Sequence, residues 1–322
     1  MIFRSFKEIR ARPKFDPGCE ITVENCDGVL GEYQFPKEEP EVPCQGRQLE
    51  RPNRCNEGHR HGWLGRRKDD GREALIGVDC GNKYFRKNVN FVADTTRITD
   101  DNRINAFVDQ LQTTVGSPDY EKTLTDALNR HKAVRATVID FQRRLPRPVV
   151  NRLQQMAKSR NYSVGMKVRY LDDEDENGNP IYRWDSEQLG AIAGVAIWDN
   201  VAASTLSYEL RNIRDTLPEI EIVPSAGLTK LRKWAATVSG LPSLVGQVAS
   251  QEATLQGFKS RDNLRLLCFL TWNSADRLGV SRCVVEEESG LSASNSACRR
   301  LLAELDSEVK KRTRDRPFKI DA

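Results

Sequence analysis

Cysteines and histidines are concentrated in one short stretch near the start of this 322-residue chain. The chain has only three histidines, and two of them, His59 and His61, follow Cys55 by four and six residues. Cys44 precedes this group and Cys80 follows it. Thiolate and imidazole are the donors that supply zinc in closed, four-coordinate structural sites. The set therefore predicts a small N-terminal module that is held together by a metal ion.

The residues between His61 and Cys80 have the pattern of a β-hairpin that leads into a helix. Segments 61–67 and 72–78 are strand-like, and residues 68–71 form a turn in which Gly71 can take a positive φ. The second strand leads back to Cys80, where we expect a turn into a short helix. Because a hairpin reverses the chain, we expect Cys80 to return to the end that carries Cys55 and His59.

The predicted metal ligands are Cys44, Cys55, His59 and Cys80, with Zn²⁺ as a structural ion. The hairpin is expected to bring Cys55, His59 and Cys80 to the same end of the module. The fourth ligand is expected to be Cys44, with His61 as the alternative. A ligand-bearing turn, a hairpin and a ligand at a helix start resemble a treble clef in outline. This chain departs from that pattern because it offers one cysteine at the helix start instead of two. The competing interpretation is that these are ordinary buried cysteines and surface histidines.

Two further cysteines lie upstream of this set. Cys19 and Cys26 could form a second metal site or substitute for Cys44, but we interpret them mainly as structural residues. The three later cysteines, Cys268, Cys283 and Cys298, have no histidine nearby, so we expect them to be small buried apolar residues.

A catalytic metal site is the less favoured alternative. An open zinc site keeps three protein ligands and one water molecule, and His59 and His61 with Glu57 or Asp79 could form such a hydrolytic centre. A histidine-bearing hairpin followed by a helix also resembles HNH-type nucleases in outline. The later histidine ligand is absent, because the next histidine is His131 on an apolar helical stripe. We therefore predict no catalytic residue.

Composition along the chain predicts an α+β protein with two domains, a zinc-binding module over residues 1–98 and a mainly helical domain over residues 99–322. The second domain is expected to contain one β-hairpin near residues 164–184, with an acidic turn between its strands. A long helix is predicted from a cap at Ser186 to Leu217, just before Pro218. The clearest apolar stripe consists of Leu124, Leu128, His131, Val134, Val138, Phe141 and Leu145.

Positive charge is concentrated over residues 121–170, which hold twelve Lys and Arg against three Asp and Glu. Most of the basic residues of the helix over 121–145 lie opposite its apolar stripe, so that they could face one polyanion together. The hairpin adds further cations. The predicted nucleic-acid contacts are Arg66, Arg67, Lys132, Arg135, Arg143, Arg144, Arg147, Arg152, Lys158 and Arg160. The competing interpretation is a solvated helix face, which is what most charged runs are.

The start of the chain predicts a cytoplasmic protein. Residues 1–7 carry charges and lack the apolar core of a signal peptide, and no run of residues is apolar enough to cross a membrane. Eight cysteines without a secretory signal are better interpreted as thiols or metal ligands than as disulfides. We predict a zinc protein that binds DNA or RNA, or recruits a partner to it. The alternatives are a protein–protein interaction adaptor without nucleic acid and, third, a metal-dependent nuclease or hydrolase.

Overall fold

The computed structural model describes residues 1–47 and 53–320, which form helices and small sheets in two compact units. The first unit comprises residues 1–117 and 220–236, and the second comprises residues 118–219 and 237–322. The predicted boundary between residues 98 and 99 lies inside one continuous helix of the first unit, α3 (Val89–Val115).

A four-stranded sheet in the order β1-β2-β5-β6 forms the centre of the first unit. Its strands are β1 (Ile2–Phe3), β2 (Cys26–Gln34), β5 (His61–Arg67) and β6 (Glu73–Gly77). β1 is parallel to β2, and the other neighbours are antiparallel. The predicted hairpin is confirmed, because β5 pairs with β6 and Gly71 in the connecting turn has a φ of +69°. A separate ribbon consists of β3 (Val42–Pro43) and β4 (Gly58–His59).

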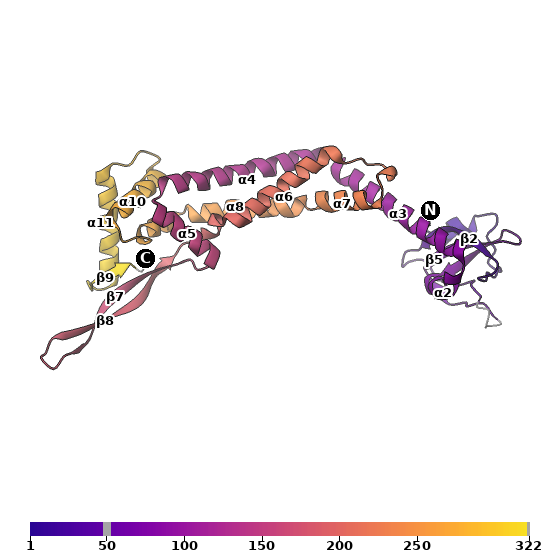
Figure 1. The fold of residues 1–322 in the computed structure, drawn as a ribbon, viewed down its shortest axis with the longest axis horizontal. Helices are drawn as coiled ribbons and strands as arrows, with labels where there is room; N and C mark the ends of the chain where they lie inside the picture. Colours follow the sequence, from indigo (N-terminus) through magenta and orange to yellow (C-terminus); the bar gives the residue numbers. More distant parts are fainter. Residues whose placement is uncertain (48–52, 321–322) are drawn as a thin grey trace. The chain divides into compact units, whose positions relative to one another are not determined.

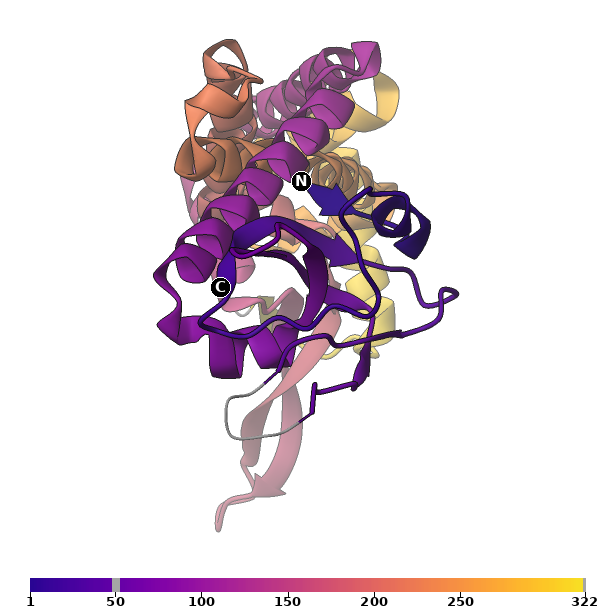
Figure 2. The same cartoon turned by 90° about the vertical axis from the view of Figure 1, so that its right-hand side faces the viewer.

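α1 (Phe6–Arg10), α2 (Val78–Tyr84) and α3 pack against this sheet. The first unit also contains most of α7 (Leu228–Ser239). Figure 2 shows the curved sheet with α3 beside it. α3 begins after Asn88, whose side chain accepts a hydrogen bond from the amide of Phe91 at 2.8 Å. The Asp94 carboxylate then accepts a hydrogen bond from the amide of Val29 in β2 at 2.9 Å, which fixes the helix to the sheet.

The second unit is built mainly from helices (Figure 1). These are α4 (Pro118–Arg144), α5 (Arg147–Ser159), α6 (Asn200–Thr216), α8 (Leu241–Phe258), α9 (Arg261–Leu266), α10 (Ser274–Ser289) and α11 (Asn295–Arg312). α4, α6 and α8 pack against one another. The predicted stripe of α4 is buried except for Leu128, which is half-buried. His131 is buried in the stripe as expected, and its Nδ1 lies 2.9 Å from Oε1 of Gln251 in α8.

A three-stranded antiparallel sheet in the order β8-β7-β9 completes the second unit. Its strands are β7 (Ser163–Glu174), β8 (Pro180–Ala191) and β9 (Phe318–Ile320). The hairpin predicted near residues 164–184 is thus confirmed. Its far end extends beyond the helices of its unit (Figure 1). The turn is closed by a hydrogen bond from the Asp175 amide to the Asn179 carbonyl at 2.8 Å, with Gly178 at a φ of +77°.

The long helix predicted from Ser186 is wrong over its first part. Residues 186–191 belong to β8, where Ser186 pairs with Lys167 of β7. The chain then turns at Gly194, whose φ is +74°, and forms a short 3₁₀-helix before α6. α6 starts at Asn200 because the Asp199 carboxylate accepts hydrogen bonds from two amides of the first turn.

Arg144 of α4 is engaged in ion pairs within the second unit. Its guanidinium lies 2.8 Å from the Asp140 carboxylate and 3.8 Å from Glu286 of α10, and it also pairs with Glu287. Burial raises the pKa of Glu287, but hydrogen bonds from Arg144 and Lys259 outweigh it, so that the pKa lies below its usual range. Arg144 therefore fixes α10 to α4, and this occupies a side chain that we predicted to contact nucleic acid.

We expect Arg144→Ala to lower the free energy of unfolding by about 2 kcal/mol, because the partly buried carboxylate of Glu287 loses a charged hydrogen bond. The pKa of Glu287 is lower in the folded chain than in the unfolded chain. The contribution of Glu287 to the free energy of unfolding is therefore complete above its pKa in the unfolded chain. It is lost as the pH falls through its pKa in the folded chain. Urea denaturation of the native chain and of Arg144→Ala at neutral and acidic pH measures the two free energies of unfolding. If the difference between them does not become smaller at acidic pH, the ion pair of Arg144 with Glu287 does not stabilise the fold.

None of the described helices combines the length and the apolar character that crossing a bilayer requires.

Candidate metal centre

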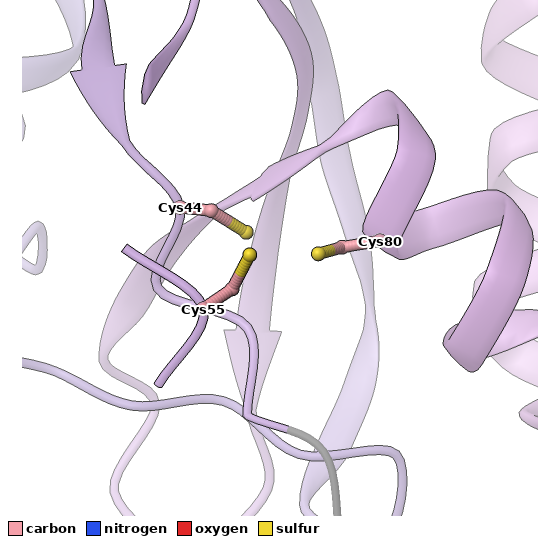
Figure 3. Close-up of side chains that lie close together, drawn as sticks. All are labelled: Cys44, Cys55 and Cys80. Atoms are coloured by element: carbon pink, nitrogen blue, oxygen red, sulfur yellow. The ribbon is translucent and has the colours of Figure 1, made fainter. Parts of the chain in front are cut away.

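Three of the four predicted metal ligands lie together in the first unit. The thiols of Cys44, Cys55 and Cys80 point toward one another, and their sulfur atoms all lie within 4.8 Å of one another (Figure 3). Sulfur atoms bound to the same tetrahedral zinc ion are about 3.8 Å apart, given a zinc–sulfur distance of about 2.3 Å. Cys44 and Cys80 are buried, and Cys55 is half-buried. This group could hold a metal ion.

Backbone hydrogen bonds place Cys44 opposite Cys55. The amide of Cys44 donates to the carbonyl of Glu57 at 2.9 Å, and the amide of Asn56 donates back to the carbonyl of Cys44 at 3.0 Å. The amide of Cys55 donates to the carbonyl of Gly46 at 2.9 Å. Asn56 has a φ of +59°, a left-handed conformation that asparagine tolerates better than most residues. The two thiols therefore come from two facing segments that follow β3 and precede β4.

The hairpin supplies the third thiol. Cys80 is the third residue of α2, which begins directly after β6 at Val78. The last residue of β6, Gly77, donates its amide hydrogen to Sγ of Cys44 at 3.5 Å. The return of the chain to Cys80 after the hairpin is therefore confirmed.

The thiols of Cys44 and Cys80 strongly influence each other. The hydrogen-bonding interaction with Cys80 lowers the pKa of Cys44 to about 4, aided by His59 and the amides of Gly77 and Gly46 and opposed by burial. The same interaction with Cys44, together with burial, raises the pKa of Cys80. The lowered pKa of Cys44 favours its thiolate, which is the form that binds a metal ion.

His59, the fourth predicted ligand, is not part of the converging group. It lines the same pocket as the three thiols, a hollow of about 290 Å³. Its Nδ1 is 2.9 Å from the hydroxyl of Tyr33, a fully buried residue of β2. Its Nε2 is buried and has no hydrogen-bond partner within the described part of the chain. Gly77 leaves room for the ring, because a Cβ at that position would lie 2.6 Å from Cδ2 of His59.

His61, the rival ligand, has a different partner. It lines the rim of the pocket, but its Nε2 lies 2.7 Å from a carboxylate oxygen of Glu32 on the neighbouring strand. Its side chain is 46% exposed. Cys44 is therefore the residue that the structure brings to Cys55 and Cys80. Glu57 and Asp79 also line the pocket, although neither belongs to the converging group.

Cys19 and Cys26 lie outside the converging group. Both are buried in the apolar cluster that also contains Cys44 and Cys80. Burial raises the pKa of Cys19, and it raises the pKa of Cys26 to about 11. Such thiols stay protonated at neutral pH, which agrees with their interpretation as structural residues. Cys268, Cys283 and Cys298 are buried in the second unit, as expected.

Several of the basic residues predicted to bind nucleic acid have acidic partners. Arg66 of β5 pairs with Asp27 at 2.6 Å, and Arg67 pairs with Asp69. Arg144 is engaged by the three carboxylates described above. Arg143, Arg147, Lys158 and Arg160 are exposed on α5 or next to it, and Arg152 is half-buried.

Lys132 and Arg135 line a groove of about 820 Å³ between α4 and α6. Arg211 and Arg214 line it from α6, together with Tyr208, whose side chain is 70% exposed. No acidic side chain is among its lining residues. The three residues from α6 were not among the predicted contacts. They are spaced three residues apart in the sequence, and this spacing could have predicted that they share one helix face.

Comparison with known proteins gave no matching family model, curated protein or solved structure for this chain.

Proposed function

We propose that this chain is a nucleic-acid-binding protein whose first unit is held together by a structural Zn²⁺ ion. The convergence of Cys44, Cys55 and Cys80 supports the metal site, and a groove in the second unit that is lined by cations supports the partner.

The proposed fourth zinc ligand is His59. Its buried Nε2 lacks a hydrogen-bond partner among the residues described, and such a nitrogen is costly unless something binds it. The tautomer that donates from Nδ1 to the oxygen of Tyr33 leaves the lone pair of Nε2 for a metal ion. Three thiolates and one imidazole are a donor set of structural zinc sites.

The zinc would act on folding. The Cys44 and Cys55 segments are joined to each other by backbone hydrogen bonds, and the ion would connect both of them to α2. Binding of such an ion contributes directly to the free energy of folding. The order of ligand-bearing turn, hairpin and ligand in the first turn of α2 also supports the treble-clef-like outline that we propose for this module.

We expect His59→Ala to weaken zinc binding by more than 100-fold, whereas His61→Ala leaves it unchanged. Tyr33→Phe removes only the group that orients His59, and the expected loss is about 10- to 100-fold. Competition with a chromogenic chelator measures all three affinities. Equal effects of His59→Ala and His61→Ala would reject His59 as the ligand.

The groove between α4 and α6 is the observation that carries the proposed function. Lys132, Arg135, Arg211 and Arg214 contribute four cations, and Arg214 has a carboxylate neighbour in Asp215 at 2.8 Å. A concave surface that gathers cations and excludes acidic side chains favours phosphates. The polar side chains Thr125, Asn129, Ser204 and Ser207 could donate further hydrogen bonds.

Retention of a labelled oligonucleotide by the full chain across salt concentrations tests this function. We expect the logarithm of the binding constant to fall linearly with the logarithm of the salt concentration, because bound phosphates release counterions. Absence of binding at low salt, or binding that is indifferent to salt, would reject the proposal and favour the protein–protein adaptor.

None of the eight cysteines forms a disulfide, and this supports a cytoplasmic location as part of the proposal.

A further inference from the structure

One face of the β8-β7-β9 sheet carries aromatic and basic side chains together. In an antiparallel sheet, directly opposite residues project from the same face. Arg169 lies opposite Trp184, and Leu171 lies opposite Tyr182. Lys167 lies opposite Lys319 of β9 and projects from this face as well. We call these six residues the outer sheet face: Lys167, Arg169, Leu171, Tyr182, Trp184 and Lys319.

The outer sheet face is directed away from the core, which the other face contacts near the start of β7. Met166 and Val168 alternate with the residues of the outer face and are fully buried. By contrast, the exposed fractions are 62% for Leu171, 46% for Tyr182 and 42% for Trp184. Such large side chains are rarely left in water together without a binding role.

Cations are stacked on the two aromatic rings. The guanidinium carbon of Arg169 lies 4.3 Å from the ring centroid of Tyr182, and Nζ of Lys319 lies 4.6 Å from that of Trp184. Tyr182 and Trp184 are two residues apart on β8, which places their rings about 7 Å apart along the strand. Each ring thus has a cation over one of its faces, and aromatic rings combined with cations are what base stacking and phosphate neutralisation use.

The charges on this sheet are separated by face. Within the described part of the sheet, the outer face holds three cations and no acidic residue. On the opposite side, Arg183 pairs with Asp172 at 3.2 Å and with Asp185 at 3.1 Å. The remaining acidic residues of the hairpin lie near its tip, at 173–176, or at Glu187, which accepts from the hydroxyl of Tyr170. The outer face is therefore complementary to a polyanion that also presents flat apolar surface.

We propose that the outer sheet face binds single-stranded nucleic acid, with bases stacked on Tyr182 and Trp184 and phosphates near Lys167, Arg169 and Lys319. A single strand is favoured over a duplex because only unpaired bases can turn their faces to protein rings. The inference rests on the proposed function and adds a second contact surface, which the groove between α4 and α6 does not require.

The probes are fluorescein-labelled oligo(dT) of about 16 nucleotides, the upper site size of common single-strand-binding modules, and a duplex of the same length. Trp184→Ala in the full chain is expected to weaken oligo(dT) binding about tenfold. Trp184→Phe keeps an aromatic ring and is expected to retain most of the affinity. The matched control is Arg183→Ala, which changes the same strand on its opposite face and should have a much smaller effect.

Tryptophan fluorescence provides a second readout that a loss of stability would not reproduce. Oligo(dT) should quench part of the fluorescence of the native chain, and Trp184→Phe should remove that part. Duplex binding should be insensitive to Trp184→Ala.

The outcomes distinguish the two proposals. Oligo(dT) binding that is unchanged by Trp184→Ala and by Tyr182→Ala, but lost on reversing charges in the groove, would overturn the outer sheet face and leave the proposed function intact. A chain that retains neither probe at low salt would overturn both. Equal losses of oligo(dT) binding for Trp184→Ala and Arg183→Ala would also overturn the stacking role.

Discussion

Cys80→Ser is expected to abolish zinc binding and to unfold the N-terminal module at room temperature. Structural zinc ions contribute about 10–16 kcal/mol of apparent binding free energy to small modules at neutral pH. This is comparable to the whole stability of a typical domain, about 5–15 kcal/mol. Through the proposed zinc ion, Cys80 would connect α2 to the two facing segments that carry Cys44 and Cys55, so we expect its loss to destabilise both. Zinc content and limited proteolysis of the full chain measure the result.

Cys19→Ala is the matched control for this change. Cys19 is as deeply buried and belongs to the same apolar cluster, but its sulfur is not part of the converging group. We expect Cys19→Ala to lower the free energy of unfolding by about 1 kcal/mol and to leave the zinc content unchanged. A Cys80→Ser protein that is as resistant to proteolysis as the Cys19→Ala protein would mean that no metal holds the module together.

The combination of Lys132→Glu with Arg211→Glu is expected to weaken oligonucleotide binding about 100-fold at moderate salt, because each change replaces an attraction for phosphate by a repulsion. The salt dependence should also become shallower. For a single strand, the loss of two phosphate contacts reduces the slope of the log–log plot by about 1.4. Fluorescence anisotropy titrations at several salt concentrations give both quantities.

Arg299→Glu with Arg300→Glu is the control for net charge. These two residues are exposed on α11 and lie outside the lining of the groove, yet their reversal changes the charge of the chain by the same amount. We expect them to weaken binding much less. Similar losses for the two pairs would indicate that binding depends on overall charge and that the groove has no special role.

The local part of the fold was predictable from the sequence. Alternation of apolar residues and a turn with Gly71 indicated the hairpin of β5 and β6, and Cys80 was expected near the start of a short helix, where it lies in the first turn of α2. The spacing of apolar residues in α4 gave that helix and its buried side. In each case the information lies within a few residues along the chain.

The first part of the helix predicted from Ser186 was wrong for a physical reason. Leu189, Ile192 and Ala196 have helical spacing, but the pairing of β8 with β7 and the positive φ of Gly194 determine the backbone there. α10 was not predicted either. Its buried residues include Ser281 alongside Val280 and Val284, so its pattern does not present a clear apolar stripe.

Contacts between distant residues could not be read from the sequence. From the sequence, Arg144 was predicted to be a surface cation. In the structure it pairs with Glu287 of α10, which is more than a hundred residues further along the chain. The hydrogen bond of Tyr33 to His59 depends on how β2 and β4 lie in space. In the same way, β9 brings Lys319 to the outer sheet face from the far end of the chain.

X-ray absorption at the zinc edge of the purified full chain measures which atoms surround the metal ion and at what distance. We predict one zinc ion per chain with a first shell of three sulfur atoms at about 2.3 Å and one nitrogen atom at about 2.0–2.1 Å. That shell matches Cys44, Cys55, Cys80 and His59. A folded chain that binds no zinc, or a zinc ion surrounded mainly by oxygen, would contradict the proposed centre.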